Sequence, residues 1–78
     1  MFIDLGQKLG NTFINSKHIC KVFSTKNKDY SGLGIRVIGE DSTIWIETKQ
    51  SPEDFINNLD RLEHLNKFKI KLEDIVNE

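Results

Sequence analysis

Apolar and polar positions alternate along much of the first fifty residues, which is the pattern of β-strands that bury one face. The alternating segments are 2–5, 18–23, 33–38 and 43–48, with a further apolar pair inside 12–15. Turn sequences separate them at 6–11, which holds two glycines, and at 15–17. In the segment 18–23 we expect Cys20 and Val22 to share the buried face, because Lys21 between them is better placed in water.

The polar segment 24–32 predicts the longest loop of the chain. A hairpin is expected after it, because the turn sequence Gly-Glu-Asp-Ser at 39–42 separates two alternating segments. A symmetric turn would pair Arg36 with Trp45 and Ile35 with Ile46. One face of the hairpin would then be apolar, formed by Leu33, Ile35, Val37, Ile44 and Ile46. The opposite face would hold Arg36, Ile38, Thr43, Trp45 and Glu47.

The sequence Ser-Pro-Glu-Asp at 51–54 predicts the start of a helix over 52–65. Ser51 can accept hydrogen bonds from the first free amides, and Pro52 suits the first helical position. Acidic residues then face the positive end of the helix dipole. An apolar stripe should pack on the sheet, formed by Phe55, Ile56, Leu59 and Leu62.

The last residues fit two patterns. The segment 67–72 alternates like a strand, whereas Leu65, Phe68, Leu72 and Ile75 recur at helical spacing. We favour a short helix near the end of the chain. The predicted fold class is α+β: a small antiparallel sheet of about four strands, then a helix packed on one face, then a short C-terminal helical tail. Residues 1–78 would form one domain, β-rich over 1–50 and helical over 51–78.

The composition is that of a small soluble protein. The chain has 78 residues, 37% of them hydrophobic and 29% charged. No apolar run approaches the roughly 18 residues of a transmembrane helix, and no secretory signal is visible. A single cysteine cannot form an internal disulfide, which favours a cytoplasmic location. The absence of alanine and the many Ile, Lys and Asn residues indicate an AT-rich coding sequence, as in some bacteria and phages.

Candidate reactive residues are few. His18 and Cys20 would share a strand face, and with His64 they are the three Cys and His residues of the chain. A structural zinc site needs four ligands, and strand neighbours do not guarantee the approach that activates a thiol. The simpler reading is a small buried thiol beside a surface histidine. We therefore expect no catalytic, cofactor-binding or metal-binding residues, no enzymatic activity and no small-molecule substrate.

The hairpin face that carries Trp45 is the candidate functional surface. One helix can cover one face of a small sheet, so the other face would expose Trp45 and Ile38, with Ile19 and Phe23 as further candidates. Exposed apolar surface of this kind indicates contact with a partner protein or a second copy of the chain. The predicted contact residues are Tyr30, Arg36, Ile38 and Trp45. Packing of Trp45 under another part of the same chain stays open as an alternative.

A second hypothesis is binding of single-stranded nucleic acid, which uses basic grooves with aromatic platforms. The residues for it would be Lys21, Lys26, Lys28, Arg36 and Trp45. The net charge of −1 speaks against it. Residues 1–50 hold seven basic against five acidic side chains, while 51–78 hold four against seven. Neither half has the charge density of a typical nucleic-acid binder.

The order of motifs in 10–59 resembles the small bacterial FlbD family, which is associated with flagellar genes. The motifs are Gly-Asn-Thr-Phe-Ile-Asn at 10–15, His18-Ile19, the alternating strands, and Ser-Pro-Glu-Asp-Phe-Ile at 51–56. This chain departs from the family in its long segment 24–32, in its turn at 39–42 and in its extension past Leu65. The resemblance implies a small β-rich fold with a non-enzymatic role, and it carries over no catalytic residues.

Overall fold

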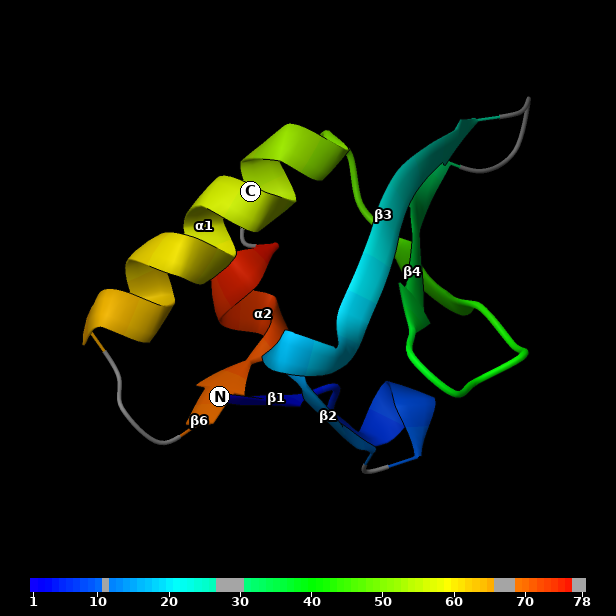
Figure 1. The fold of residues 1–78 in the computed structure, drawn as a ribbon. Helices are drawn as coiled ribbons and strands as arrows, with labels where there is room; N and C mark the ends of the chain where they lie inside the picture. Colours follow the sequence, from blue (N-terminus) through cyan, green and yellow to red (C-terminus); the bar gives the residue numbers. More distant parts are fainter. Residues whose placement is uncertain (11, 27–30, 66–68, 77–78) are drawn as a thin grey trace.

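The computed structural model describes residues 1–10, 12–26, 31–65 and 69–76 (Figure 1). Two 3₁₀ helices and one long helix accompany six strands in these ranges, with a one-turn helix at the end. The elements in chain order are β1 (Phe2–Asp4), η1 (Gln7–Leu9), β2 (Phe13–Asn15), η2 (Ser16–His18), β3 (Ile19–Lys26), β4 (Ser31–Val37), β5 (Ile44–Glu47), α1 (Pro52–Leu65), β6 (Lys69–Lys71) and α2 (Leu72–Ile75).

The strands form two sheets, so the α+β class is confirmed but the expected single sheet of about four strands is wrong. One sheet has three antiparallel strands in the order β3-β4-β5. The other has the order β2-β1-β6, in which β2 is antiparallel to β1 and β6 is parallel to it. The parallel pair joins the two ends of the chain. A parallel pair needs a long crossover connection rather than a local turn. No short-range sequence pattern therefore predicts it.

The core lies between the two sheets and the helices. Its buried side chains come from every strand except β3, from both α-helices and from the residue just past β1: Ile3, Leu5, Ile14, Leu33, Ile35, Ile46, Phe55, Leu59, Ile70 and Ile75. The predicted inner face of the hairpin is therefore confirmed. So is most of the helical stripe, but Ile56 is 45% exposed and does not belong to it. Figure 1 shows α2 lying between α1 and the short strands. The Asn58 side-chain amide donates a 3.1 Å hydrogen bond to the Ile75 carbonyl, which fixes α2 against α1.

Helix α1 begins where the sequence predicts it. The Asp54 amide donates a 3.1 Å hydrogen bond to Ser51 Oγ, as an N-cap requires. The favoured short helix near the end of the chain is confirmed by α2. The helical spacing does not extend back to Leu65, which is 73% exposed at the end of α1; Phe68 lies outside the described residues. The tail instead uses both of its patterns in turn, β6 first and α2 directly after it. The β6 strand also lies within the part of the chain that was expected to be helical.

A β-bulge near the start of β3 overturns the expected burial of Cys20. Ile19 pairs with Val37 and Lys21 pairs with Arg36, so the register shifts at Cys20. The extra residue brings Ile19 to the core side together with Val22 and leaves Cys20 exposed. His18 belongs to η2 rather than to the strand. His18 and Cys20 therefore do not share a strand face.

The segment 24–32 is mostly strand, not loop. Strand β3 continues to Lys26 and β4 begins at Ser31, so the two form a long hairpin. Positions 27–30 lie outside the described residues, and with them the predicted contact residue Tyr30 and the candidate Lys28. The first turn, expected at 6–11, contains the 3₁₀ helix η1 between Gly6 and Gly10, whose φ angles of 77° and 78° favour glycine.

Candidate interaction surface

The outer face of the β3-β4-β5 sheet, which we define as the side turned away from the core, carries Lys21, Phe23, Gly34, Arg36, Trp45 and Glu47. The alternation of each strand assigns these residues, because their neighbours Val22, Leu33, Ile35 and Ile46 pack in or against the core. Trp45 is 49% exposed and Ile38, just past β4, is 66% exposed. Within the described residues the N-terminal strands and the tail contribute to the core side instead.

The register of the β4–β5 hairpin differs by two residues from the symmetric one. Ile35 pairs with Ile44 and Gly34 pairs with Trp45. A shift by an even number keeps every side chain on its face, so the faces were predicted correctly while the pairs were wrong. Trp45 thus lies opposite Gly34, not Arg36. The turn between the strands is correspondingly longer, and Gly39 in it has a φ of 85°.

Phe23, Gly34 and Trp45 form a row across the three strands, because Phe23 and Trp45 both pair with Gly34. The ring of Phe23 lies directly over Gly34, where a Cβ atom would come within 2.4 Å of its Cζ atom. Its ring centroid is 5.6 Å from that of Trp45, at an interplanar angle of 84°. Edge-to-face contact of this kind is favourable for two aromatic rings. Phe23 and Trp45 together form an aromatic platform seated on a glycine.

Of the two basic residues on this face that the structure describes, one contacts the aromatic platform. Lys21 Nζ lies 5.2 Å from the Phe23 ring centroid, in cation–π contact. Arg36 is oriented differently: its Nη2 donates hydrogen bonds of 3.4 and 3.1 Å to the carbonyl oxygens of Glu40 and Asp41. The guanidinium therefore fastens the β4–β5 turn. The expected pairing of Arg36 with Trp45 as cross-strand neighbours is wrong for the same reason that the register is wrong.

The structure brings together only part of each predicted residue set. Trp45 and Ile38 are exposed as the protein-contact hypothesis expects, and Lys21 joins Trp45 through Phe23 as the nucleic-acid hypothesis expects. Arg36 is half-buried and engaged with the turn. Lys26 ends β3, and only its backbone is described. From the sequence, Phe23 was only a further candidate for this surface. Its alternation with Val22 already indicated that it lies on the outer face.

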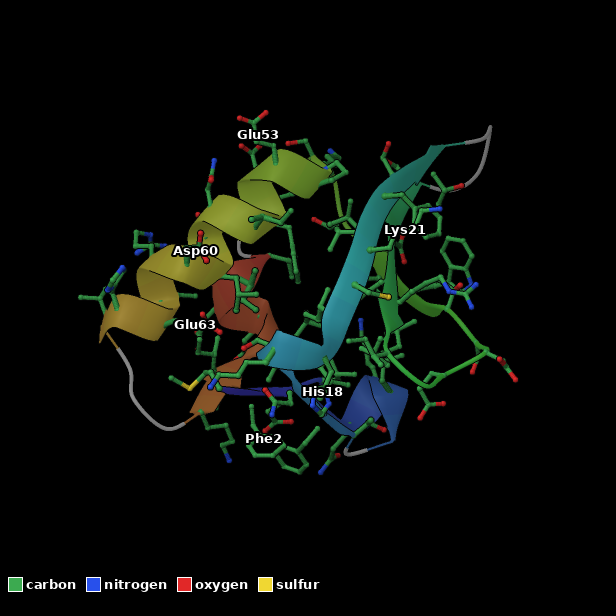
Figure 2. The ribbon with its side chains drawn as sticks, in the orientation of Figure 1. Phe2, His18, Lys21, Glu53, Asp60 and Glu63 are labelled. Atoms are coloured by element: carbon green, nitrogen blue, oxygen red, sulfur yellow. The ribbon has the colours of Figure 1, made fainter. Side chains whose placement is uncertain are left out.

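A second aromatic surface was missed in the sequence. Phe2 and Phe13 are 53% and 50% exposed on the outer face of the β2-β1-β6 sheet. Figure 2 shows Phe2 directed away from the α1 side of the molecule. Lys69 Nζ lies 5.3 Å from the Phe13 ring centroid and 4.0 Å from Asp4 Oδ2. The signal was present in Phe-Ile-Asp-Leu at 2–5, since Ile3 and Leu5 face the core and the alternate residues must face outward.

An open groove of about 880 Å³ runs beside β5. One wall is formed by the successive residues Trp45, Ile46 and Glu47. The rest of the lining comes from two separate segments, the end of β1 through η1 and the end of β6 through α2: Asp4, Leu5, Gly6, Gln7, Lys8, Leu9, Lys71, Leu72, Glu73 and Val76. The groove therefore lies between β5 of one sheet and the ends of β1 and β6 of the other, and Trp45 belongs both to it and to the aromatic platform.

The candidate reactive residues are dispersed in the described parts of the chain. The Cys20 thiol donates to the Arg36 carbonyl across the bulge at 3.5 Å. His18 lies in η2 and His64 in the last turn of α1, and both are exposed. Among the described residues no group of three or more His, Cys, Asp or Glu side chains is arranged to hold a metal ion. The helices in these ranges include none with the length and hydropathy to cross a membrane.

Comparisons with protein-family models, with curated proteins and with solved structures found no match to this chain. The resemblance to the FlbD family therefore stays a prediction from the motifs alone. What the chain does has to be argued from its own surfaces.

Proposed function

We propose that this protein is a non-catalytic binding or assembly module that uses the outer face of the β3-β4-β5 sheet to contact a second copy of itself or a partner protein. We place it in the cytoplasm of a bacterial or phage-type system, as the single cysteine and the composition suggest. The observation that supports the contact most directly is the aromatic platform, in which two large rings stay partly exposed although the molecule has a core that could have buried them.

The platform has the properties of an interface anchor. Tryptophan is enriched among the few side chains that dominate binding energies, because it buries a large area at a low entropic cost. Phe23 and Trp45 are in edge-to-face contact, and the Phe23 ring lies against Gly34. Both side chains therefore lose little conformational entropy on binding. Around the two rings lie Lys21 and Glu47, one charge of each sign, which suits the mixed polar rim of a protein interface.

One observation favours the second hypothesis, single-stranded nucleic acid. Lys21 lies over the Phe23 ring beside Trp45, which places one cation next to a stacking platform. The same face carries Glu47, and Arg36 is occupied by the turn carbonyls. Phosphate binding is mostly a matter of positive charge, so this face is a poor electrostatic match. We therefore rank the protein contact first.

The test of the first hypothesis is self-association measured by sedimentation velocity between about 10 μM and 1 mM, the range of weak protein contacts. Trp45→Ala should weaken association at least about tenfold, as loss of an anchor side chain does. Ile56→Ala is the matched control, because Ile56 on α1 is exposed to a similar degree, 45% against 49%. A wild-type protein that stays monomeric throughout would reject self-association, and equal effects of the two variants would reject Trp45 as the anchor.

The second hypothesis is tested by the fluorescence of Trp45, the single tryptophan of the chain. A mixed single-stranded oligonucleotide is titrated at two salt concentrations. Quenching that weakens steeply with salt would establish nucleic-acid binding and favour it over the protein contact. An emission spectrum that ignores the oligonucleotide, together with association in sedimentation, supports the protein contact.

A further inference from the structure

The wall of the groove formed by β5 is a sheet edge. Strand β5 is the last strand in the order β3-β4-β5, so one of its sides has no strand beside it. Side chains of successive strand residues point to opposite faces. Trp45, Ile46 and Glu47 all line the groove, and a groove that touches both faces must run along the edge itself.

The main-chain groups that point into this edge can be assigned. The Thr48 amide donates to the Ser31 carbonyl at 3.2 Å, and these residues extend the β4–β5 register. Hydrogen-bonded and non-hydrogen-bonded pairs alternate along an antiparallel ladder. Ile46 and Ile44 therefore direct their amides and carbonyls at β4, whereas Trp45 and Glu47 direct theirs away from it. Among the described residues nothing hydrogen-bonds to the amide or carbonyl of Trp45 or Glu47.

We propose that the groove binds an extended segment of a partner polypeptide, which adds to the sheet as a fourth strand beside β5. The segment would exchange main-chain hydrogen bonds with Trp45 and Glu47 and place apolar side chains at alternate positions into the groove. This proposal rests on the proposed function, since it gives the partner's chemistry at a site that shares Trp45. Strand addition to an exposed edge is a known mode of peptide recognition, with the main chain giving affinity and the pockets giving specificity.

The lining of the groove favours a free segment over a second copy of this chain. Its apolar lining includes Leu9, Leu72 and Val76, which need apolar side chains opposite them. The β5 strand of a second copy could offer only Trp45 among its exposed large apolar side chains, because Ile46 is buried in its own core with 5% of its surface exposed. A free extended segment brings alternate side chains that are not yet buried.

The charges at the groove favour a peptide over a nucleic acid. Asp4 is engaged by Lys69 and by the Gly6 amide, which donates to its carboxylate at 2.9 Å. The other charged residues of the lining are two lysines and two glutamates: Lys8, Lys71, Glu47 and Glu73. Such a balance gives no attraction for a polyanion, and it predicts binding that depends little on salt.

The test uses random dodecapeptides displayed on phage and selected on the immobilised protein. Enriched peptides are then measured against Glu47→Pro and the control Glu47→Ala. Proline removes the amide that points to the free edge and spares the ladder to β4, and proline is tolerated on edge strands for this reason. Alanine removes the side chain and keeps the amide. We expect peptides with apolar residues at alternate positions, binding at least about tenfold more weakly to Glu47→Pro and nearly unchanged to Glu47→Ala.

A second readout covers the case in which Glu47→Pro fails to fold. In the wild-type protein the Trp45 and Glu47 amides should exchange hydrogen rapidly when free and become protected by an enriched peptide. The Ile46 amide, directed at β4, should be protected in both states. Peptides that leave the Trp45 and Glu47 amides unprotected would overturn strand addition, as would a selection that enriches no peptide.

Two further outcomes separate this inference from the proposed function. Self-association that is abolished by Glu47→Pro and kept by Glu47→Ala would show that a second copy occupies the edge, which overturns the peptide. Binding or association that is lost in Lys21→Glu or Trp45→Ala but unaffected by Glu47→Pro would place the contact on the outer face alone. The proposed function would then stand and strand addition would fall.

Discussion

The two sheets of this protein have similar faces but arrange their exposed aromatic side chains differently. Each buries one face in the common core and exposes aromatic side chains on the other, with a lysine over one ring. In the β3-β4-β5 sheet the rings of Phe23 and Trp45 touch each other over Gly34. Among the described residues these two rings are the only aromatic pair in contact. Phe2 and Phe13 on the other sheet are exposed without such a partner.

The difference follows from how each sheet is assembled. The strands β3, β4 and β5 follow one another in the chain and are joined by hairpins. The other sheet collects three strands of three residues each from both ends of the chain. Long hairpins hold cross-strand neighbours in register, so a glycine can be placed opposite two aromatic rings. Short strands make fewer such rows, and they depend on the core for their position.

The largest effect should come from the β6 strand. Ile70 is 1% exposed, and Ile70→Ala should lower the free energy of unfolding by about 2–5 kcal/mol, because the methyl groups lost leave a cavity in the core. Lys71→Ala on the same strand is the control, with an expected change under about 0.5 kcal/mol for an exposed side chain. Urea unfolding measures both. A loss below about 1 kcal/mol for Ile70→Ala would show that the second sheet contributes little to the fold.

Folding and unfolding rates should distinguish the two sheets, which equilibrium unfolding alone does not. Ile35→Ala should slow folding about tenfold, because the local hairpins around β4 form early, at low cost in loop closure. Ile70→Ala should mainly speed unfolding, because the two ends of the chain pair only after the folding transition state. Stopped-flow measurements over a range of urea concentrations give both rates. Similar slowing of folding by both variants would mean that the two sheets form together.

The row across the antiparallel sheet should respond to Gly34→Ala. The new Cβ would meet the Phe23 ring at 2.4 Å, so the ring must move off and lose its contact with Trp45. We expect a destabilisation of about 1 kcal/mol and a red shift of the Trp45 emission. In a Phe23→Ala background the same change should be neutral or slightly stabilising, since alanine suits a strand better than glycine does. Additive effects in this double-mutant cycle would contradict the coupling.

The smallest effects should come from the two lysine–aromatic contacts. Lys21→Met and Lys69→Met should each destabilise by about 0.5–1 kcal/mol at most, because exposed cation–π contacts are weak. Lys69→Met should be the more sensitive of the two to salt, since Lys69 also lies 4.0 Å from Asp4. Thermal unfolding at low and high salt measures this. Equal salt dependence would indicate that the contact with Asp4 is fully screened already.

Some features of the candidate surface could be predicted because they follow from local periodicity. The inner and outer faces of the β4–β5 hairpin were assigned correctly, since alternation fixes the face whatever the register. The partner of Trp45 was not, because register depends on the turn, and the turn between Val37 and Ile44 is longer than a symmetric one. The bulge at Cys20 could not be predicted either, because one extra residue in a strand does not change the composition.

The sequence by itself determined the cap at Ser51, the extent of α1, the alternation of the strands and the face of the β4–β5 hairpin on which Trp45 lies. Each depends on interactions between residues close in the chain, whose free energies are set by the side chains themselves. Only the tertiary structure decided that β6 pairs with β1, that Phe23 covers Gly34 and that β5 borders a groove. The β6–β1 pair and the groove join segments far apart in the chain, and the position of Phe23 over Gly34 depends on the register between strands. Such arrangements are selected by the packing of one shared core rather than by any local pattern.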